Sequence, residues 1–236
     1  MIEAGVHLAA AVGTFQYYWD LVLHSIGPIA LGGLLGTIPL SLVAFAVGLI
    51  LAIVVALMRL STRKALRGIA RVFVSIVRGT PLLVQLFVVF YGLPTIGILL
   101  DPWPSAIIAL SLNVGGYASE VVRAAILAVP RGQWEAGYTI GMGNTMTLWR
   151  IVLPQAARVS VPPLSNTFIS LVKDTSLASV ILVTELFREA QQIAAASSEF
   201  LVLYIEAAVV YWLICLVLSS GQTAIEKRLD RYVAHA

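Results

Sequence analysis

Residues 25–58 form an uninterrupted stretch of 34 amino acids without a charged side chain. As a helix, this stretch would reach about 50 Å at about 1.5 Å per residue, whereas the hydrocarbon core of a bilayer is roughly 30 Å thick. It is therefore long enough to cross a membrane. The composition agrees, because 59% of the 236 residues are hydrophobic and only 11% are charged, compared with about a quarter in soluble domains. These features exclude a soluble globular enzyme.

Stretches of similar character predict an all-α, polytopic membrane protein with five transmembrane helices. We expect these helices at residues 29–58, 79–100, 102–119, 159–184 and 200–225. Residues 14–25, TFQYYWDLVLHS, are rich in aromatic side chains and predict an interfacial helix before the first span. In the first span, Gly32 and Gly36 have the spacing that lets two helices approach closely.

The distribution of Lys and Arg predicts the orientation of the chain, because cytoplasmic loops are enriched in these residues. Residues 59–71 carry five of them and no acid, and residues 130–160 carry three against one acid. On the other side, residues 185–199 contain three acids against one Arg. We therefore expect the N-terminus outside and the C-terminus in the cytoplasm. The expected regions are an extracytoplasmic N-terminal segment at 1–28, a transmembrane domain at 29–226 and a cytoplasmic tail at 227–236.

The long cytoplasmic connection at about residues 130–158 contains the signals of a short helix over 133–142. Glu135 falls in its first turn, where the positive helix end favours an acid, and Gly141 is placed to end it. Three large side chains share one side of this helix at helical spacing: Trp134, Tyr138 and Met142. Two interpretations remain open on these grounds. The helix rests on lipid headgroups, or it docks into a groove of a cytoplasmic partner.

The same segment resembles the EAA signature, EAA-x3-G-x9-I-x-LP, of permease subunits in bacterial ATP-binding-cassette (ABC) importers. Six of the seven fixed positions agree, from Glu135 through Gly141 to Leu153-Pro154, and Gly137 stands at the third position of EAA in place of the usual alanine. We expect this glycine to loosen the helix slightly. The resemblance favours docking, because in that family the helix fits a cleft on the ATPase subunit. The residues it implies for ATPase coupling are Gln133, Trp134, Glu135, Ala136, Gly137, Tyr138, Ile140, Gly141 and Met142.

Further segments narrow the resemblance to a subfamily. RGTPLLVQLF at 78–87, SLNVGGYASEVVRAAI at 111–126 and LVKDTSLASVI at 171–181 are similar to five-span permeases that import polar amino acids. FYGLPTIGILLDPWPSAIIALSLN at 90–113 and ELFREAQQI at 185–193 look closest to permeases of L-cystine importers. Other polar amino acids, such as glutamine or glutamate, remain alternative substrates.

The resemblance implies an ABC type I importer permease fold in the bacterial cytoplasmic (inner) membrane. It also implies three protein partners, which are cytoplasmic ABC ATPase subunits, an extracytoplasmic substrate-binding protein and a second permease subunit in a homo- or heterodimer. Membrane lipid surrounds the spans, and we expect no nucleic-acid partner. The sequence has no Gly-Lys pair and so lacks the G-x-x-x-x-G-K-[ST] motif. We therefore expect no cofactor in this chain, with ATP and Mg²⁺ bound by the partner ATPase.

Polar side chains within the spans are candidates for substrate binding, because such groups are costly at membrane depth and are usually functional. The candidates are Gln85, Asn113, Tyr117, Asn166, Thr167, Ser170, Lys173 and Asp174. Four of them share one face of the fourth span at spacings of three and four, namely Asn166, Thr167, Ser170 and Asp174. We expect Asp174 to pair with the ammonium group of an amino acid, and amides or hydroxyls to hold its carboxylate. Alternatively, Lys173 and Asp174 form a structural pair near the outer interface.

Thr167 indicates the charge of the substrate. In the resembling family, permeases for cationic amino acids tend to carry a carboxylate seven residues before the position of Asp174, and this chain has Thr167 there. The difference favours a net-neutral substrate. Near the inner end of the third span, Glu120 and Arg123 have the spacing of an intrahelical ion pair, and Arg78 is expected to be an interfacial anchor or a contact within the bundle.

Other classes of membrane protein find little support. The three histidines, His7, His24 and His235, lie near the chain ends, so none is available at depth to activate a serine. The H-E-x-x-H pattern is absent and Cys215 is the single cysteine, so no catalytic or metal site is expected. An intramembrane enzyme is therefore unsupported, and five spans without a repeat are too few for the usual secondary carrier.

Overall fold

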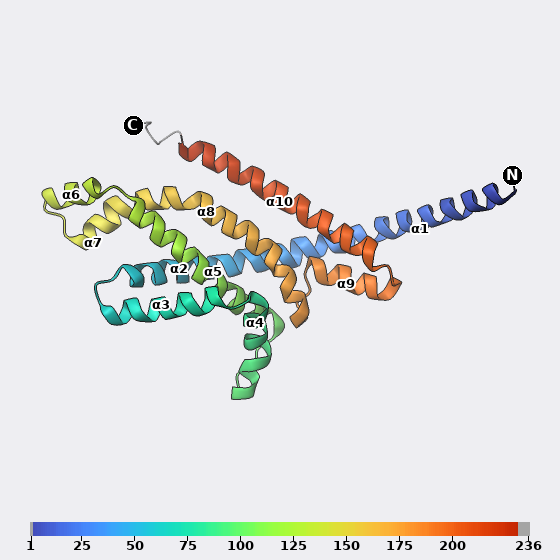
Figure 1. Ribbon diagram of the computed structural model, residues 1–236, viewed down its shortest axis with the longest axis horizontal. Helices are drawn as coiled ribbons and strands as arrows, with labels where there is room; N and C mark the ends of the chain where they lie inside the picture. The colour runs from blue at the N-terminus through green and yellow to red at the C-terminus, as the bar shows by residue number, and fades with distance from the viewer. Residues whose placement is uncertain (1, 231–236) are drawn as a thin grey trace.

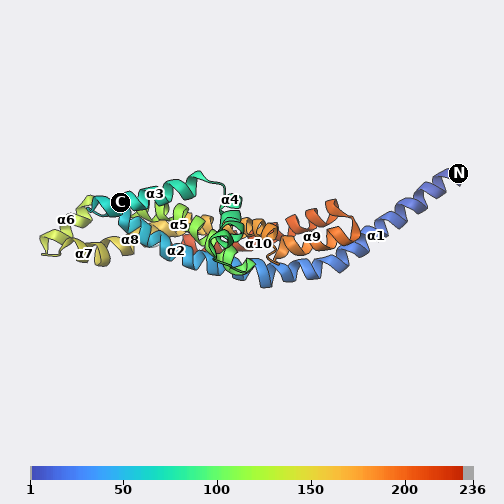
Figure 2. The same ribbon diagram turned by 90° about the horizontal axis from the view of Figure 1, so that it is seen from below.

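The structure, a computed structural model, describes residues 2–230 of the chain, and the side chains of residues 15–228. Helices make up nearly all of this part, and no β-strand occurs in it, which confirms the expected all-α class. The long helices run close to the longest axis of the molecule, and the two ends of the bundle are formed by α1 and by α6 with α7 (Figure 1; Figure 2).

The first long helix crosses the molecule without a break. It comprises α1 (Ile2–Gly32), a π turn η1 (Gly33–Thr37) and α2 (Ile38–Leu60), and its apolar part spans Phe15–Leu60. Residues 14–25 are helical, as expected, but no break separates them from the span expected at residue 29. The segment contains Pro28 but no residue that stops the helix, and a membrane helix tolerates a proline. The residues of the uncharged stretch that exceed the length of one span belong to the same helix.

The second span is sharply bent and begins earlier than expected. Helix α3 (Lys64–Gly79) packs on α2 and α5 through Ala70, Val74 and Val77. The chain then bends by 107° into α4 (Leu82–Phe87), η2 (Val88–Gly92) and η3 (Leu93–Ile96). The expected cytoplasmic loop at 59–71 and the straight span at 79–100 are both corrected. Because the charges of α3 lie on one side, its apolar side is free to pack on the bundle.

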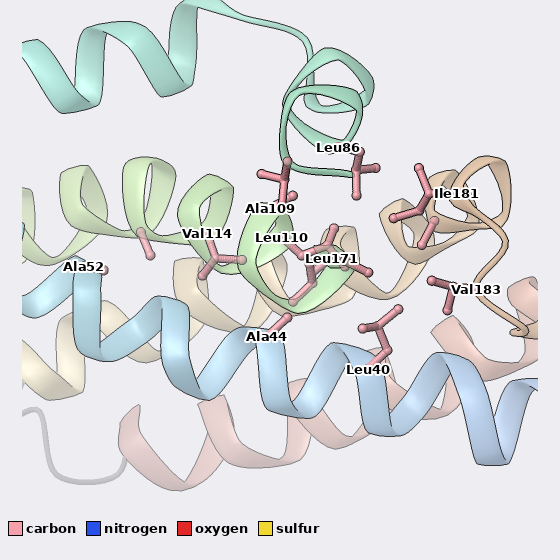
Figure 3. Close-up of a cluster of buried hydrophobic side chains, with 14 residues drawn as sticks. Leu40, Ala44, Ala52, Leu86, Ala109, Leu110, Val114, Leu171, Ile181 and Val183 are labelled. Carbon is pink, nitrogen blue, oxygen red and sulfur yellow. The ribbon is translucent and has the colours of Figure 1, made fainter. Parts of the chain in front are cut away.

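Helix α5 (Pro102–Ala128) lies against α2 and extends nine residues beyond its expected end at residue 119. Glycines make the contact close, because a Cβ on Gly48 would lie 2.6 Å from Cβ of Val114, and a Cβ on Gly115 would lie 2.6 Å from Leu51. The main hydrophobic core forms at this contact, between α2, α4, α5, α8 and η5 (Figure 3).

The fourth span also begins early. After α6 (Arg131–Thr139), the chain is helical from Asn144 to Ile181 through α7 (Asn144–Thr147), η4 (Leu148–Val152), α8 (Leu153–Asp174) and η5 (Thr175–Ile181). The connection at 130–158 is thus a helical hairpin rather than a long loop. Pro154 does not interrupt this helix, because it lies in the first turn of α8, directly after a π turn, where a missing N–H is tolerated.

The remaining helices are α9 (Leu186–Ser197), which bends by 47° from the fourth span, and α10 (Phe200–Asp230). They pack with α1 around Ile29, Leu186 and Leu203. Three helices are long and apolar enough to cross a membrane, and the two bent pairs bring the number to five when each counts as one span. This result agrees with the five-span prediction.

A buried carboxylate, which the sequence did not single out, ties these helices together. Glu185 is fully buried, and its Oε2 accepts hydrogen bonds from Thr37 Oγ1 at 3.2 Å and Tyr211 OH at 2.6 Å. A Cβ on Gly36 would lie 2.6 Å from Cα of Glu185. The close approach expected at Gly32 and Gly36 therefore occurs, and its partner is the start of α9 in the same chain.

Candidate functional site

A cavity of about 450 Å³ lies at the break between α3 and α4, enclosed by α5 and α8. It brings together six of the eight side chains predicted to bind substrate, namely Asn113, Tyr117, Asn166, Thr167, Ser170 and Asp174. They come from two helices that are far apart in sequence. The shared helix face expected in the fourth span is therefore confirmed to face one hollow.

The depth of the cavity follows from its neighbours on α2. Ser111 Oγ donates to the carbonyl of Ala44 at 3.1 Å, and Val114, which lines the cavity, packs on Gly48. Residues 44 and 48 lie well inside the uncharged stretch, so the cavity lies within the apolar part of the bundle. Thr80 and Pro81 leave the helix there. Irregular backbone at this depth is tolerated where it lines a cavity or is buried in protein.

Gln85 stands behind the cavity wall rather than on it. Its Nε2 donates to the carbonyl of Val77 at 2.8 Å and to that of Thr80 at 3.1 Å, and its Oε1 accepts from Asn113 Nδ2 at 3.3 Å. Gln85 therefore satisfies backbone groups left open by the bend and orients Asn113, which does line the cavity.

Lys173 also lies outside the cavity lining, and its side chain is exposed. All three ion pairs recorded among the described side chains involve Glu120, so the alternative of a Lys173–Asp174 pair is not formed within this part of the chain. Asp174 is half-buried and lines the cavity, which leaves its carboxylate available to a cationic group entering there.

Glu120 joins three helices below the cavity. It pairs with Arg59 of α2, with Arg123 of its own helix at 3.0 Å and with Arg78 of α3 at 3.7 Å. The expected pair with Arg123 is therefore present, but it is one of three. Arg78 also lies over the ring of Tyr117, with Cζ 5.4 Å from the ring centroid, so it is a contact within the bundle.

Replacing Glu120 by Gln is expected to lower the thermal stability of the detergent-solubilised permease. The change leaves three guanidinium groups close together without an acid, and the lost charged hydrogen bonds of these partly exposed side chains cost about 2 kcal/mol. Thermal unfolding followed by fluorescence measures the effect. Glu226→Gln, on α10, removes one negative charge elsewhere and serves as the control. An unfolding temperature equal to that of the wild type for Glu120→Gln would contradict this role.

Helix α6 projects at the end of the molecule opposite α1 (Figure 1). It occupies 131–139, two residues earlier at its start than expected, and Gly141 follows with a φ of +80°, as expected of a glycine that ends a helix. Trp134 is half-buried in a cluster with Val129 and Val152. The side chain of Gln133 accepts a hydrogen bond from Gln155 at 3.1 Å.

The remaining residues of this segment divide into one packed position and several exposed ones. Gly137 is buried, and a Cβ there would lie 2.7 Å from Cγ2 of Thr147. The glycine therefore lets α6 pack tightly on α7. Exposed on the outer side are Glu135, Ala136, Tyr138, Ile140 and Gly141, while Met142 is half-buried.

Comparisons with known proteins identify the family of this chain and several relatives. Residues 44–231 match the model of the family described as binding-protein-dependent transport system inner membrane component. The L-cystine transport system permease protein TcyB of Bacillus subtilis (strain 168) is 62% identical over 92% of this chain and 93% of its own length. The arginine transport system permease protein ArtQ of the same organism is 36% identical over 86% of this chain and 93% of its own.

A solved structure supports the same assignment. It is described as the crystal structure of an amino acid ABC transporter with histidines, and one of its chains is 31% identical, with a TM-score of 0.79 over 91% of this chain and 97% of that one. Members of the family are multi-pass transport components that lack an ATPase of their own and act with ATPase and substrate-binding proteins. The chain belongs to the family of binding-protein-dependent transport system inner membrane components.

Proposed function

We propose that this chain is the permease subunit of an ABC importer that moves L-cystine into the cytoplasm. The observation that carries the proposal is the polar cavity within the apolar part of the bundle, with Asp174 on one side and Asn113 and Tyr117 on the other. A carboxylate suits an ammonium group, while amides and hydroxyls suit a carboxylate. The similarity to an L-cystine permease over nearly the whole chain supports the choice among amino acids.

One position in the cavity wall favours a substrate without net charge over a cationic one. Asp174 is the one ionisable acid or base of the cavity, and Thr167 stands where a second carboxylate would favour a cation. Cystine has two ammonium and two carboxylate groups in two identical halves. A homodimer would offer Asp174 and its neighbours twice about a two-fold axis, which matches both halves of such a molecule.

The proposed mechanism is alternating access driven from the cytoplasmic side. In it, an external binding protein delivers the amino acid, and two ATPase subunits close on ATP against α6. The exposed side chains Glu135, Tyr138 and Ile140 form the docking surface, while Trp134 and Gly137 transmit its movement to α7 and α8 through their packing. The exposed side of α6 and its place at one end of the bundle support this assignment (Figure 2).

The proposed orientation has the N-terminus outside and the C-terminus in the cytoplasm. It is supported by the five Lys and Arg at residues 59–71, which enclose the junction of α2 and α3, because such clusters remain on the cytoplasmic side.

Uptake in cells tests the proposed substrate. A bacterial strain without cystine import, supplied with this permease, its ATPase and its binding protein, should accumulate labelled L-cystine and grow with cystine as sole sulfur source. Unlabelled glutamine or arginine in excess should not compete. Uptake of labelled glutamine, with no uptake of labelled cystine, would replace cystine by another polar amino acid.

A further inference from the structure

Helix α3 carries a basic stripe, defined here as Lys64, Arg67, Arg71 and Arg78. Spacings of three, four and seven residues place these side chains on one side of the helix. A second side, with Ala70, Val74 and Val77, is buried against α2 and α5. A third side exposes large apolar residues, which are Ile69, Val72 and Ile76. The helix therefore has separate core, apolar outer and basic faces.

The basic stripe leads from the cavity to the end of the bundle. Arg78 lies over Tyr117, which lines the cavity, and the wall residue Thr80 follows directly after α3. From Arg78 back to Arg67 the helix descends about 16 Å at about 1.5 Å per residue. The stripe thus lies between the cavity and the junction of α2 and α3.

The positive charge of the stripe is largely uncompensated. Between residues 59 and 131, Asp101 and Glu120 are the only acids, against eight Lys and Arg. Glu120 is already shared by three arginines, and Arg78 is the most distant of them at 3.7 Å. The Nε of Arg67 is buried and has no hydrogen-bond partner among the described residues. Charged groups at membrane depth face a protein interior or a water-filled path, and the apolar outer face is available for lipid.

We propose that the basic stripe binds the carboxylate groups of the substrate on the cytoplasmic side of the cavity and forms its exit path. The inference rests on the proposed import of an amino acid. A lipid phosphate has similar chemistry, but the stripe adjoins the cavity through Arg78 and Tyr117, which favours the substrate. Arg67 and Arg71 are the binding residues of this path, because Arg78 also supports Glu120.

Uptake into proteoliposomes tests the basic stripe. The complete complex, with the ATPase and ATP enclosed and the binding protein outside, is compared with the double variant Arg67→Gln/Arg71→Gln. We expect initial uptake about fivefold lower, a rise of about 1 kcal/mol in the barrier, with assembly unchanged. Arg67→Lys/Arg71→Lys should restore most of the rate. The matched control is Arg228→Gln, an exposed arginine on α10, which should transport normally.

Two further arms separate the alternatives. High salt inside the vesicles should slow the wild type more than the Gln variant, because screening acts on exposed charges.

Vesicles of phosphatidylcholine alone should show the same defect as vesicles that also contain phosphatidylglycerol. A defect confined to the anionic vesicles would assign the stripe to lipid phosphate, and undiminished uptake by the Gln variant would overturn the exit path. If the Gln variant no longer assembles and the Lys variant assembles no better, the basic stripe has a structural role instead. Absence of uptake by the wild type would contradict the proposed function itself.

Discussion

A permease with Glu135→Arg should assemble in the membrane and still lose ATP-driven uptake, by about 100-fold. Glu135 is exposed at the start of α6, whereas Trp134 and Gly137 attach this helix to the rest of the chain. The variant therefore leaves the fold of α6 intact and changes its outer surface alone. Reversal of a charge at a docked interface costs several kcal/mol. Substrate-stimulated ATP hydrolysis and uptake in proteoliposomes measure the loss.

The control for this variant is Glu226→Arg, which makes the same reversal on α10, away from α6. It should keep both activities near the wild-type level. Normal stimulation of ATP hydrolysis by substrate in the Glu135→Arg complex would remove α6 from the ATPase interface.

Asp174→Asn should reduce uptake by about 10- to 100-fold at subsaturating substrate, while the complex still assembles and hydrolyses ATP at its basal rate. The change preserves shape but removes the negative charge from the cavity wall. Hydrogen bonds to charged groups contribute about 1.5–3 kcal/mol, and the lost pairing with the substrate ammonium group accounts for the expected range. Initial uptake rates of labelled substrate over a concentration series provide the measurement.

Lys173→Gln is the matched variant for Asp174→Asn, because Lys173 is its neighbour in sequence but lies outside the cavity lining. Its uptake should stay within about twofold of the wild type, as for most exposed substitutions. Equal losses in both variants would restore the alternative of a structural pair, and unimpaired uptake by Asp174→Asn would remove this residue from the substrate path.

The membrane class and the number of spans could be predicted from the sequence, because uncharged stretches such as 25–58 leave few other folds. The residues at which the helices begin and end were harder to predict. Lys64, Arg67 and Arg71 made the start of α3 look like a loop, although their charges occupy one side of a helix whose other side packs on α2 and α5. The 107° bend falls at Thr80 and Pro81, where the proline favours the extended conformation of Thr80, but the size of the bend has no signal in the sequence.

The candidate site was predictable in part because its residues repeat at helical spacing within α8. Asn166, Ser170 and Asp174 could be assigned to one face, and the cavity lies there. Whether a side chain lines the cavity or lies behind its wall depends on contacts between segments that are far apart in the sequence. Gln85 donates hydrogen bonds to backbone carbonyls at the bend, and Glu120 forms ion pairs with arginines from three helices.

Gly137 is the one position at which this chain departs from the EAA signature, and its role depends on packing. The helix signals at 133–142 located α6, which spans Arg131–Thr139, to within three residues at each end. The effect of the missing methyl group depended on Thr147, ten residues away, whose side chain occupies the space that a Cβ would need. The role of Gly137 in close packing is therefore not visible from helix propensity, which is a weak guide beside tertiary contacts.

The most direct test of the proposed function measures ATP hydrolysis by the reconstituted complex of permease, ATPase and loaded binding protein in liposomes, across a panel of amino acids, sugars and peptides. Import of a polar amino acid through the cavity at Asp174 predicts that L-cystine raises the rate above its basal level and that Asp174→Asn weakens this response. Stimulation by a sugar or a peptide, and by no amino acid, would contradict it.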